Sequence, residues 1–175
     1  MELAIAPKLH FFTNFGKIIT VRPAVALSTR LPWLQRRLDV SFSVGYVTAG
    51  LDFSEGQQQY HSRLHAWPLE LFATYALDVA RARFFFGAGA QLTFLRASVT
   101  SRSQQENELV LRQGDVEGGL LLLTGAEFAL GVGALFAEVG YTFSTRSEGL
   151  VVAGLSGFSL GVGYRLPFRI FHWQE

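Results

Sequence analysis

Apolar side chains alternate with small or polar side chains along most of the chain, a period of two that is typical of β-strands with two different faces. In residues 158–168 one face carries Phe, Leu, Val and Tyr, and the other carries Ser, Gly, Arg and Pro. The same division recurs in residues 3–11, 19–27, 38–48, 65–77, 83–95, 120–130 and 135–145. The pattern therefore predicts about eight strands of roughly 10 to 14 residues each.

These predicted strands are long for a soluble sheet. Strands of globular proteins average about 5–6 residues, whereas a tilted strand needs about 9–11 residues to cross a bilayer. The bulky face is apolar, and the opposite face is rich in Gly, Ala, Ser and Thr. Because a barrel of about eight strands has a narrow interior, we expect the small face to line it and the bulky face to meet lipid. The predicted fold is all-β: an eight-stranded antiparallel up-and-down transmembrane β-barrel over residues 1–168, with a C-terminal tail over residues 169–175.

The composition supports a membrane protein and excludes some kinds of site. Only 17% of the 175 residues are charged, against about 25% in soluble proteins, and the mean hydropathy is +0.25. The absence of Cys excludes disulfides and cysteine–metal sites. A net charge of +1 without a clustered basic face gives no support for nucleic acid as a partner. No leader-peptide pattern precedes the first strand, so an exported chain is expected to be a mature form.

Two other architectures stay open from the sequence. Residues 120–136 are apolar enough for a candidate membrane helix, although Glu127 at the centre would be costly in lipid. A soluble β-sandwich, or a soluble barrel that binds an apolar ligand, would place the bulky face in a core.

The predicted connections are short on one side of the barrel and long on the other. Residues 78–82, 131–133 and 31–37 make the shorter set, and residues 13–16 join the opposite side. The long polar loops on that opposite side are residues 54–62, 101–117 and 146–154. This asymmetry predicts periplasmic termini and extracellular long loops. Val110 and Leu111 alternate with charged neighbours, which predicts that their loop extends as a hairpin whose strand edge is open to a partner strand.

Ionisable residues on the small face are expected to meet inside the barrel, where they must pair or be hydrated. The predicted lumen charge network consists of Lys8, Arg22, Asp39, Glu70, Glu127, Glu138 and Arg165. We expect it to plug the lumen, with a gated ion path or a proton-transfer role as the alternatives. Aromatic residues near the strand ends predict interfacial girdles, formed by Trp67, Tyr75, Phe84, Phe94, Tyr141, Tyr164 and Phe168.

Candidate chemistry is weak elsewhere. His61, Ser62, His65 and Glu70 lie close together in sequence, but His65 shares the lipid face with Trp67, whereas Glu70 points inward. Ser62 has no arrangement of a base and an orienting partner, so no catalytic residue is predicted. The spacing of His61 and His65 is uninformative about metal at a loop-to-strand junction. The closely spaced glycines open no helix and precede no Lys-Ser or Lys-Thr, so no phosphate loop, cofactor or metal is expected.

Two segments carry a resemblance to a known family. WPLELFATYAL and RFFFGAGAQLTF lie within residues 67–94, and LFAEVGYTFS and GFSLGVGYRLPF lie within residues 135–168. Together they resemble hairpins of the OmpA/OmpX/OmpW-like group of small outer-membrane β-barrel proteins. The resemblance implies that the barrel-assembly machinery reads a terminal-strand signal at Gly161, Tyr164, Leu166 and Phe168. The chain departs from the group because RIFHWQE follows Phe168, and Phe171 and Trp173 are candidates to anchor this tail at the membrane interface.

The function expected from these features is that of a non-enzymatic outer-membrane protein. It would stabilise the envelope or bind external ligands through its long loops, with outer-membrane lipid and the barrel-assembly machinery as further partners. The resemblance to OmpW-like members implies an alternative, a narrow channel for small or apolar solutes. A lipid-modifying enzyme that depends on His65 is a third hypothesis.

Overall fold

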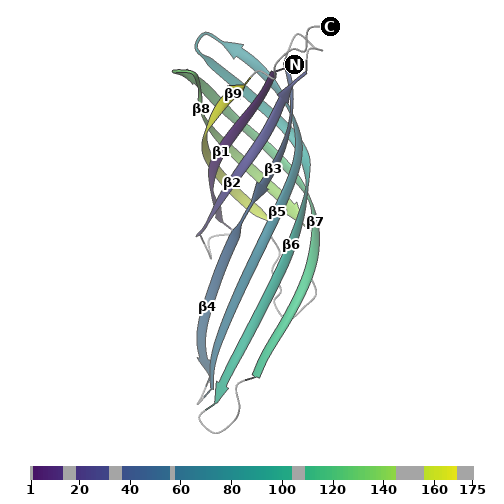
Figure 1. The fold of residues 1–175 in the computed structure, drawn as a ribbon, viewed down its shortest axis with the longest axis vertical. Helices are drawn as coiled ribbons and strands as arrows, with labels where there is room; N and C mark the ends of the chain where they lie inside the picture. Colours follow the sequence, from purple (N-terminus) through teal and green to yellow (C-terminus); the bar gives the residue numbers. More distant parts are fainter. Residues whose placement is uncertain are drawn as a thin grey trace.

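The chain forms one sheet that closes on itself. The computed structural model describes residues 2–13, 19–31, 37–55, 58–103, 109–144 and 156–168. Its strands are β1 (Glu2–Thr13), β2 (Ile19–Arg30), β3 (Leu38–Gly45), β4 (Val47–Glu55), β5 (Gln58–Val79), β6 (Ala82–Ser103), β7 (Leu109–Leu130), β8 (Gly133–Ser144) and β9 (Gly157–Phe168). All pairings are antiparallel, and the β1–β9 and β3–β5 pairs close the ring (Figure 1). The predicted all-β up-and-down barrel is confirmed.

Strands β3 and β4 are two parts of one strand along β5. Val44 of β3 pairs with Leu69, and Val47 of β4 pairs with Ala66, so β5 passes both in a single register. Pro68 lies between these two pairings, and proline has no N–H to donate to a ladder. With β3 and β4 counted together, the nine strands of the described residues make the eight that the alternation predicts.

The bulky face lies outside the barrel and the small face lies inside. Large apolar side chains of every barrel strand are exposed, with Leu120 at 65% and Phe86 at 54%. The lumen-facing positions alternate with them and are buried, among them Ala6, Ser43 and Thr93. A soluble sandwich or soluble barrel would show the reverse arrangement, so that alternative is wrong.

The helix considered for residues 120–136 is wrong as well, because these residues belong to β7 and β8. Glu127 and Leu121 point into the lumen, where a carboxylate can find partners, while Leu120 and Leu122 face outward. No helix of the described residues is long and apolar enough to cross a membrane.

Aromatic side chains mark two levels of the outer face. Trp67 pairs with Phe94 at one level, and Phe84 lies at the other. The ten residues of strand from Phe84 to Phe94 have a length of about 33 Å along the strand. At a tilt of about 40° this length corresponds to about 25 Å along the barrel axis, which is the height of the apolar band of an outer-membrane barrel. All seven predicted girdle residues lie on the outward face. Tyr46, Phe86, Phe143 and Phe158 extend the two levels, since Phe86 contacts Tyr75, Tyr46 contacts Trp67, and Tyr141 packs against both Phe143 and Phe158.

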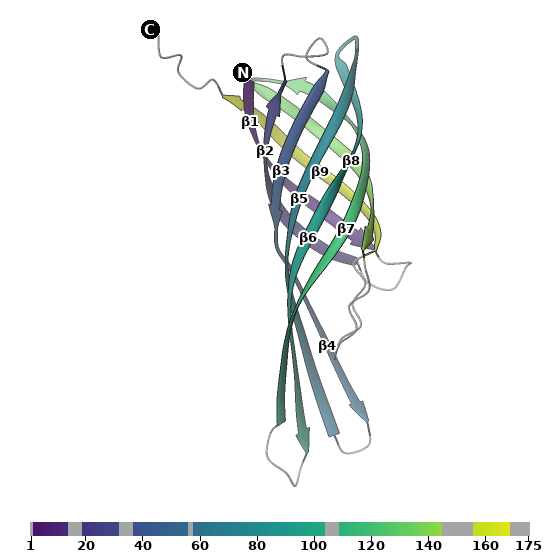
Figure 2. The same ribbon diagram turned by 90° about the vertical axis from the view of Figure 1, so that its right-hand side faces the viewer.

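Strand β1 begins and strand β9 ends at the end of the barrel that carries the two tightest turns (Figure 2). Val79 pairs with Ala82 across one turn, and Leu130 pairs with Gly133 across the other. Gly131 in the second turn has a φ of 61°, the left-handed conformation that such a hairpin needs and that glycine adopts without strain. The short turns expected within residues 78–82 and 131–133 are therefore confirmed.

Two of the expected long loops are instead strands. Strand β4 runs to Glu55 and β5 starts at Gln58, while β6 runs to Ser103 and β7 starts at Leu109. These ends of β4, β5, β6 and β7 form a four-stranded sheet that projects beyond the barrel, called the protruding sheet below (Figures 1 and 2). The expected loops over residues 54–62 and 101–117 were wrong, although the hairpin expected around Val110 is correct. Residues 146–154 and the tail 169–175 lie outside the described residues.

The polar sequences of these strand ends explain why they were expected to be loops. Inside a bilayer the outward face must be apolar, so alternation is sharp there. Beyond the bilayer this requirement ends, and polar residues occupy outward positions of the same strands. In the protruding sheet the apolar residues lie on the inner face instead, where Val47, Leu64, Ala66 and Leu95 pack together.

Small residues in the lumen make room for the rings of neighbouring strands. A Cβ at Gly163 would lie 2.5 Å from Cζ of Phe136 and 2.6 Å from the carbonyl oxygen of Pro7. By contrast, nothing lies within 4 Å of a Cβ built on Gly118.

We therefore expect Gly163→Ala to lower the free energy of unfolding by about 1–3 kcal/mol, because overpacking forces side chains or backbone to shift. Urea unfolding of the refolded protein in lipid vesicles, followed by tryptophan fluorescence, measures the change. Gly118→Ala is the matched control and should leave the midpoint nearly unchanged. Equal midpoints for the two variants would contradict the close ring packing.

Candidate functional site

The charged residues of the lumen are the candidate functional site. Each lies on the small face of its strand, and the ring of strands brings these faces together. The structure places all seven predicted residues inside the barrel, in two separate clusters. Lys8, Arg22, Glu70 and Glu138 belong to the first cluster, and Asp39, Glu127 and Arg165 belong to the second.

The first cluster, called the central cluster, joins strands that are far apart in sequence. Nζ of Lys8 lies 3.2 Å from Oε1 of Glu138 and 3.6 Å from Oε2 of Glu70. A terminal nitrogen of Arg22 lies 2.6 Å from Oε1 of Glu70. All four side chains are buried, and two cations face two carboxylates. The cluster is therefore neutral overall, which burial of charge requires.

His10 completes the central cluster. A terminal nitrogen of Arg22 lies 2.6 Å from Nδ1 of His10, and Nε2 of His10 lies 2.9 Å from Oε1 of Glu138. Because a guanidinium can only donate, Nδ1 must accept, and the ring hydrogen then lies on Nε2. From that position it faces Oε1 of Glu138. His10 thus bridges Arg22 and Glu138 as a neutral imidazole.

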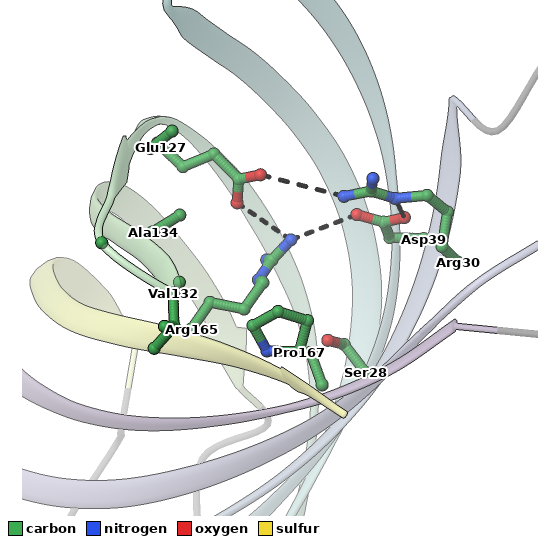
Figure 3. Close-up of a pocket in the computed structure, with 12 residues that line it drawn as sticks. Ser28, Arg30, Asp39, Glu127, Val132, Ala134, Arg165 and Pro167 are labelled. Carbon is green, nitrogen blue, oxygen red and sulfur yellow. Dashed lines mark hydrogen bonds and ion pairs between the residues drawn. The ribbon is translucent and has the colours of Figure 1, made fainter. Parts of the chain in front are cut away.

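The second cluster, called the turn-end cluster, lies toward the tight turns of the barrel. A terminal nitrogen of Arg165 lies 3.2 Å from Oδ2 of Asp39 and 2.9 Å from Oε2 of Glu127. Arg30 and Arg83 also reach both carboxylates, at distances of 3.3 to 3.9 Å. Three arginines thus surround two carboxylates. Figure 3 shows Arg165 between Asp39 and Glu127, and Arg30 next to Asp39.

A pocket of about 300 Å³ opens beside the turn-end cluster. Its polar wall is made by Arg30, Asp39, Glu127 and Arg165, and small or apolar residues such as Pro167 make the remainder (Figure 3). The arginines of this wall are already engaged by carboxylates. The pocket therefore has the features of a hydrated vestibule at one end of the lumen.

An apolar layer separates the two clusters. It consists of buried residues contributed by several strands: Ala6, Ala26, Phe72, Ala76, Phe85, Leu121, Leu123 and Phe136. Nζ of Lys8 lies 5.2 Å from the centre of the Phe72 ring, and Cζ of Arg165 lies 5.9 Å from the centre of the Phe136 ring. The layer therefore contacts the central cluster on one side and the turn-end cluster on the other.

The sequence prediction missed three residues of the two clusters, His10, Arg30 and Arg83. A signal for each was present, because His10 has the same parity as Lys8, Arg30 the same parity as Arg22, and Arg83 the same parity as Phe85. Arg83 stood next to a predicted turn and Arg30 next to a predicted connection, so neither was assigned to a face.

The histidines outside the lumen are held by local contacts on the outward face. Nδ1 of His61 contacts Asp52, and its Nε2 accepts a hydrogen bond of 2.7 Å from Nε of Arg63. Nδ1 of His65 lies 2.8 Å from the hydroxyl of Tyr46. Glu70 lies in the lumen, away from both histidines. No group of three or more His, Asp or Glu side chains in the described part of the chain is arranged to hold a metal ion.

The residues of the terminal-strand signal divide between the two faces of β9. Gly161 lies against Glu138 and His10 in the lumen. Leu166 and Phe168 are exposed on the outward face, and the hydroxyl of Tyr164 donates to the carbonyl of Leu130 at 2.6 Å. The outward aromatic and apolar positions of β9 are thus available at the barrel surface.

The central cluster should be sensitive to loss of one charge. We expect Glu70→Gln to reduce the free energy of unfolding by about 3–5 kcal/mol, because Lys8 and Arg22 would lose a buried counter-charge. Urea titration of the refolded protein provides the measurement. The control is Asp52→Asn, which removes an exposed carboxylate of the protruding sheet and should change stability little. A Glu70→Gln midpoint as high as the control would show that the central cluster does not support the barrel.

Comparisons with known proteins identify the fold. No family model matches the chain, and no curated protein matches its sequence. Neisserial surface protein A shares 17% identity at a TM-score of 0.53, with 95% of this chain and 96% of that chain covered. Ail, the attachment invasion locus protein of Yersinia pestis, shares 13% identity at 0.51 over 94% and 97% of the two chains. A major outer membrane protein from Thermus thermophilus shares 14% identity at 0.62 over 95% and 98%. The chain has the fold of small outer-membrane β-barrel proteins.

Proposed function

We propose that the chain is a non-enzymatic protein of the bacterial outer membrane that binds external partners through its protruding sheet. The observation that carries this proposal is the sheet itself, which continues four strands beyond the apolar band of the barrel. Such an extension is unnecessary for spanning the membrane. Its four paired strands present a surface of a size that suits recognition.

The edges of the protruding sheet support a strand-pairing mode of recognition. Among the described residues, β7 pairs with β8 only from Gly119 onward, so residues 109–118 have a strand neighbour on one side alone. Strand β4 likewise pairs with β5 on one side. Edge strands present rows of N–H and C=O groups that can bind an extended segment of a partner.

The interior of the barrel supports a structural role for the lumen. Two clusters of paired charges and the apolar layer between them fill a narrow space. We infer that this arrangement plugs the lumen and stabilises the barrel. A narrow channel for small or apolar solutes is the second candidate, and the pocket beside the turn-end cluster favours it.

The placement of the histidines supports a non-enzymatic role. Ser62 lies on the opposite face of β5 from His61, because adjacent residues of a strand point to opposite sides. Both ring nitrogens of His61 have partners, Asp52 and Arg63, and neither partner is a hydroxyl that the ring could activate. A lipid-modifying enzyme would require a nucleophile, a base and an orienting group in contact.

The proposed orientation has periplasmic termini and an extracellular protruding sheet. Short turns on the periplasmic side and long extensions on the outer side are the rule for outer-membrane barrels. In this orientation the outward side chains of β9, including Leu166 and Phe168, are the proposed signal for the barrel-assembly machinery.

A plugged lumen should not conduct ions. We expect the purified protein in planar bilayers to show no stable open level, because the buried side chains of the apolar layer occupy the lumen between the two clusters. A double variant, Phe72→Ala and Phe136→Ala, removes two of its rings and should produce measurable openings. A stable open level in the unaltered protein would support the channel and contradict the plug.

The protruding sheet should be dispensable for folding and required for binding. A trimmed variant would lack residues 51–62 and 98–112, with tight hairpin turns joining Gly50 to Arg63 and Ala97 to Gln113, which are paired in the structure. We expect it to keep the mobility shift on heating in SDS gels. Strand-forming peptides selected from a displayed library should bind intact cells carrying the full chain and not cells carrying the trimmed variant. Equal binding to both would contradict the proposed surface and its extracellular placement.

A further inference from the structure

The outward face of the protruding sheet carries a band of positive charge directly beyond the aromatic level. The pairings Trp67↔Phe94 and Phe94↔Val116 define the last apolar row across β5, β6 and β7. Two residues further along each strand, the next row on the same face is His65, Arg96 and Gly114. The row after that is Arg63, Ser98 and Arg112. Three arginines therefore lie together on neighbouring strands of one face.

Two of these arginines lack a counter-charge within the described part of the chain. Arg96 and Arg112 are exposed and form no ion pair with any residue that the structure describes. Acidic residues of β7 do not neutralise them, because Asp115 and Glu117 have the opposite parity and point to the inner face. Arg63 differs from the other two, since it donates to His61, which in turn contacts Asp52. Asp52 is the single acidic side chain described on the outward face of the protruding sheet.

The position of the band relative to the apolar surface indicates its partner. Two residues of strand advance about 7 Å, which is about 5 Å of height at a tilt of about 40°. The headgroup region extends about 5–8 Å beyond the hydrocarbon core on each side of a bilayer. The row with Arg96 therefore falls within the headgroups, and the row with Arg112, about 10 Å beyond the aromatic row, lies just outside them, within reach of a long arginine side chain. The side chains point outward, toward the lipid that surrounds the barrel.

We propose that Arg96 and Arg112, assisted by Arg63, bind the phosphate groups of lipid headgroups in the leaflet next to the protruding sheet. Guanidinium groups bind phosphate through parallel charge-assisted hydrogen bonds, and a lipid phosphate supplies the anion that Arg96 and Arg112 lack among the described residues. Tyr46, His65 and Trp67 stack beside the band and give the lipid an aromatic surface below its headgroup. This surface rests on the proposed placement of the barrel in a membrane, and it deepens the proposed function by naming one partner of the protruding sheet.

The fluorescence of Trp67 reports on the lipid next to Arg96, because Trp67 lies one row below Arg96 on the same face. In a Trp33→Phe, Trp173→Phe background it is the one tryptophan left in the chain. This protein is reconstituted into nanodiscs of phosphatidylcholine mixed with phosphatidic acid, and either lipid carries brominated acyl chains that quench nearby tryptophan. The ratio of quenching by the two brominated lipids measures the preference of the Trp67 surroundings for the phosphomonoester lipid. Because both leaflets of the disc have the same composition, the result does not depend on orientation or on binding of an external partner.

We expect phosphatidic acid to be preferred, and the preference to fall about fivefold for each of Arg96→Gln and Arg112→Gln, as expected for one cation at an anionic surface. Arg96→Lys keeps the charge and should retain most of the preference. The control is Arg81→Gln, which removes an exposed arginine at the opposite end of the barrel and should leave quenching unchanged. The heat-induced mobility shift in SDS gels establishes that each variant is folded.

Three results would overturn the proposal. The first is equal quenching of Trp67 by the two brominated lipids in the protein with all its arginines. The second is a preference that survives in the Arg96→Gln, Arg112→Gln double variant. The third is loss of the preference when inorganic phosphate is added at the concentration of the lipid, because the surface would then bind free phosphate rather than a headgroup.

Discussion

The rest of the structure depends on closure of the sheet. A bilayer offers no water to unpaired N–H and C=O groups, so a spanning sheet must have no free edge. The β1–β9 and β3–β5 pairings remove the edges of the barrel. Closure of about eight strands also sets a narrow lumen, and it gives every spanning strand one face toward lipid and one toward that lumen. The alternation in the sequence follows from this division.

The narrow lumen explains why charge and bulk are arranged in layers. Charges inside it are far from bulk water and must meet opposite charges, as Lys8, Arg22, Glu70 and Glu138 do in the central cluster. Aromatic rings fill the space between the clusters, and glycines on facing strands leave room for them. Breaking one buried pair costs more than its formation contributes, since the remaining charge loses its partner. This filling of the lumen supports a structural role for the barrel.

The requirement that lipid sets on the outward face ends where the strands leave the membrane. The outward face no longer needs to be apolar, and it carries arginines and histidines in the protruding sheet. The inner face takes up the apolar residues instead, around Val47, Ala66 and Leu95. The same strands thus change from an anchor in lipid to an amphipathic surface above it. Both proposed interactions, strand pairing at the edges and phosphate binding on the outward face, arise from this change.

The sequence by itself determined the fold class and the face of most residues, because side chains in a strand alternate with a period of two and the bilayer makes the two faces chemically different. It placed seven charged residues in the lumen, but not their partners. Lys8 and Glu138 are 130 residues apart, and only closure of the ring brings them together. His10, Arg30 and Arg83 joined the clusters through the same closure. The protruding sheet was also decided by the tertiary structure, because outside the bilayer polar strands and polar loops have similar sequences, and only pairing with neighbouring strands distinguishes them.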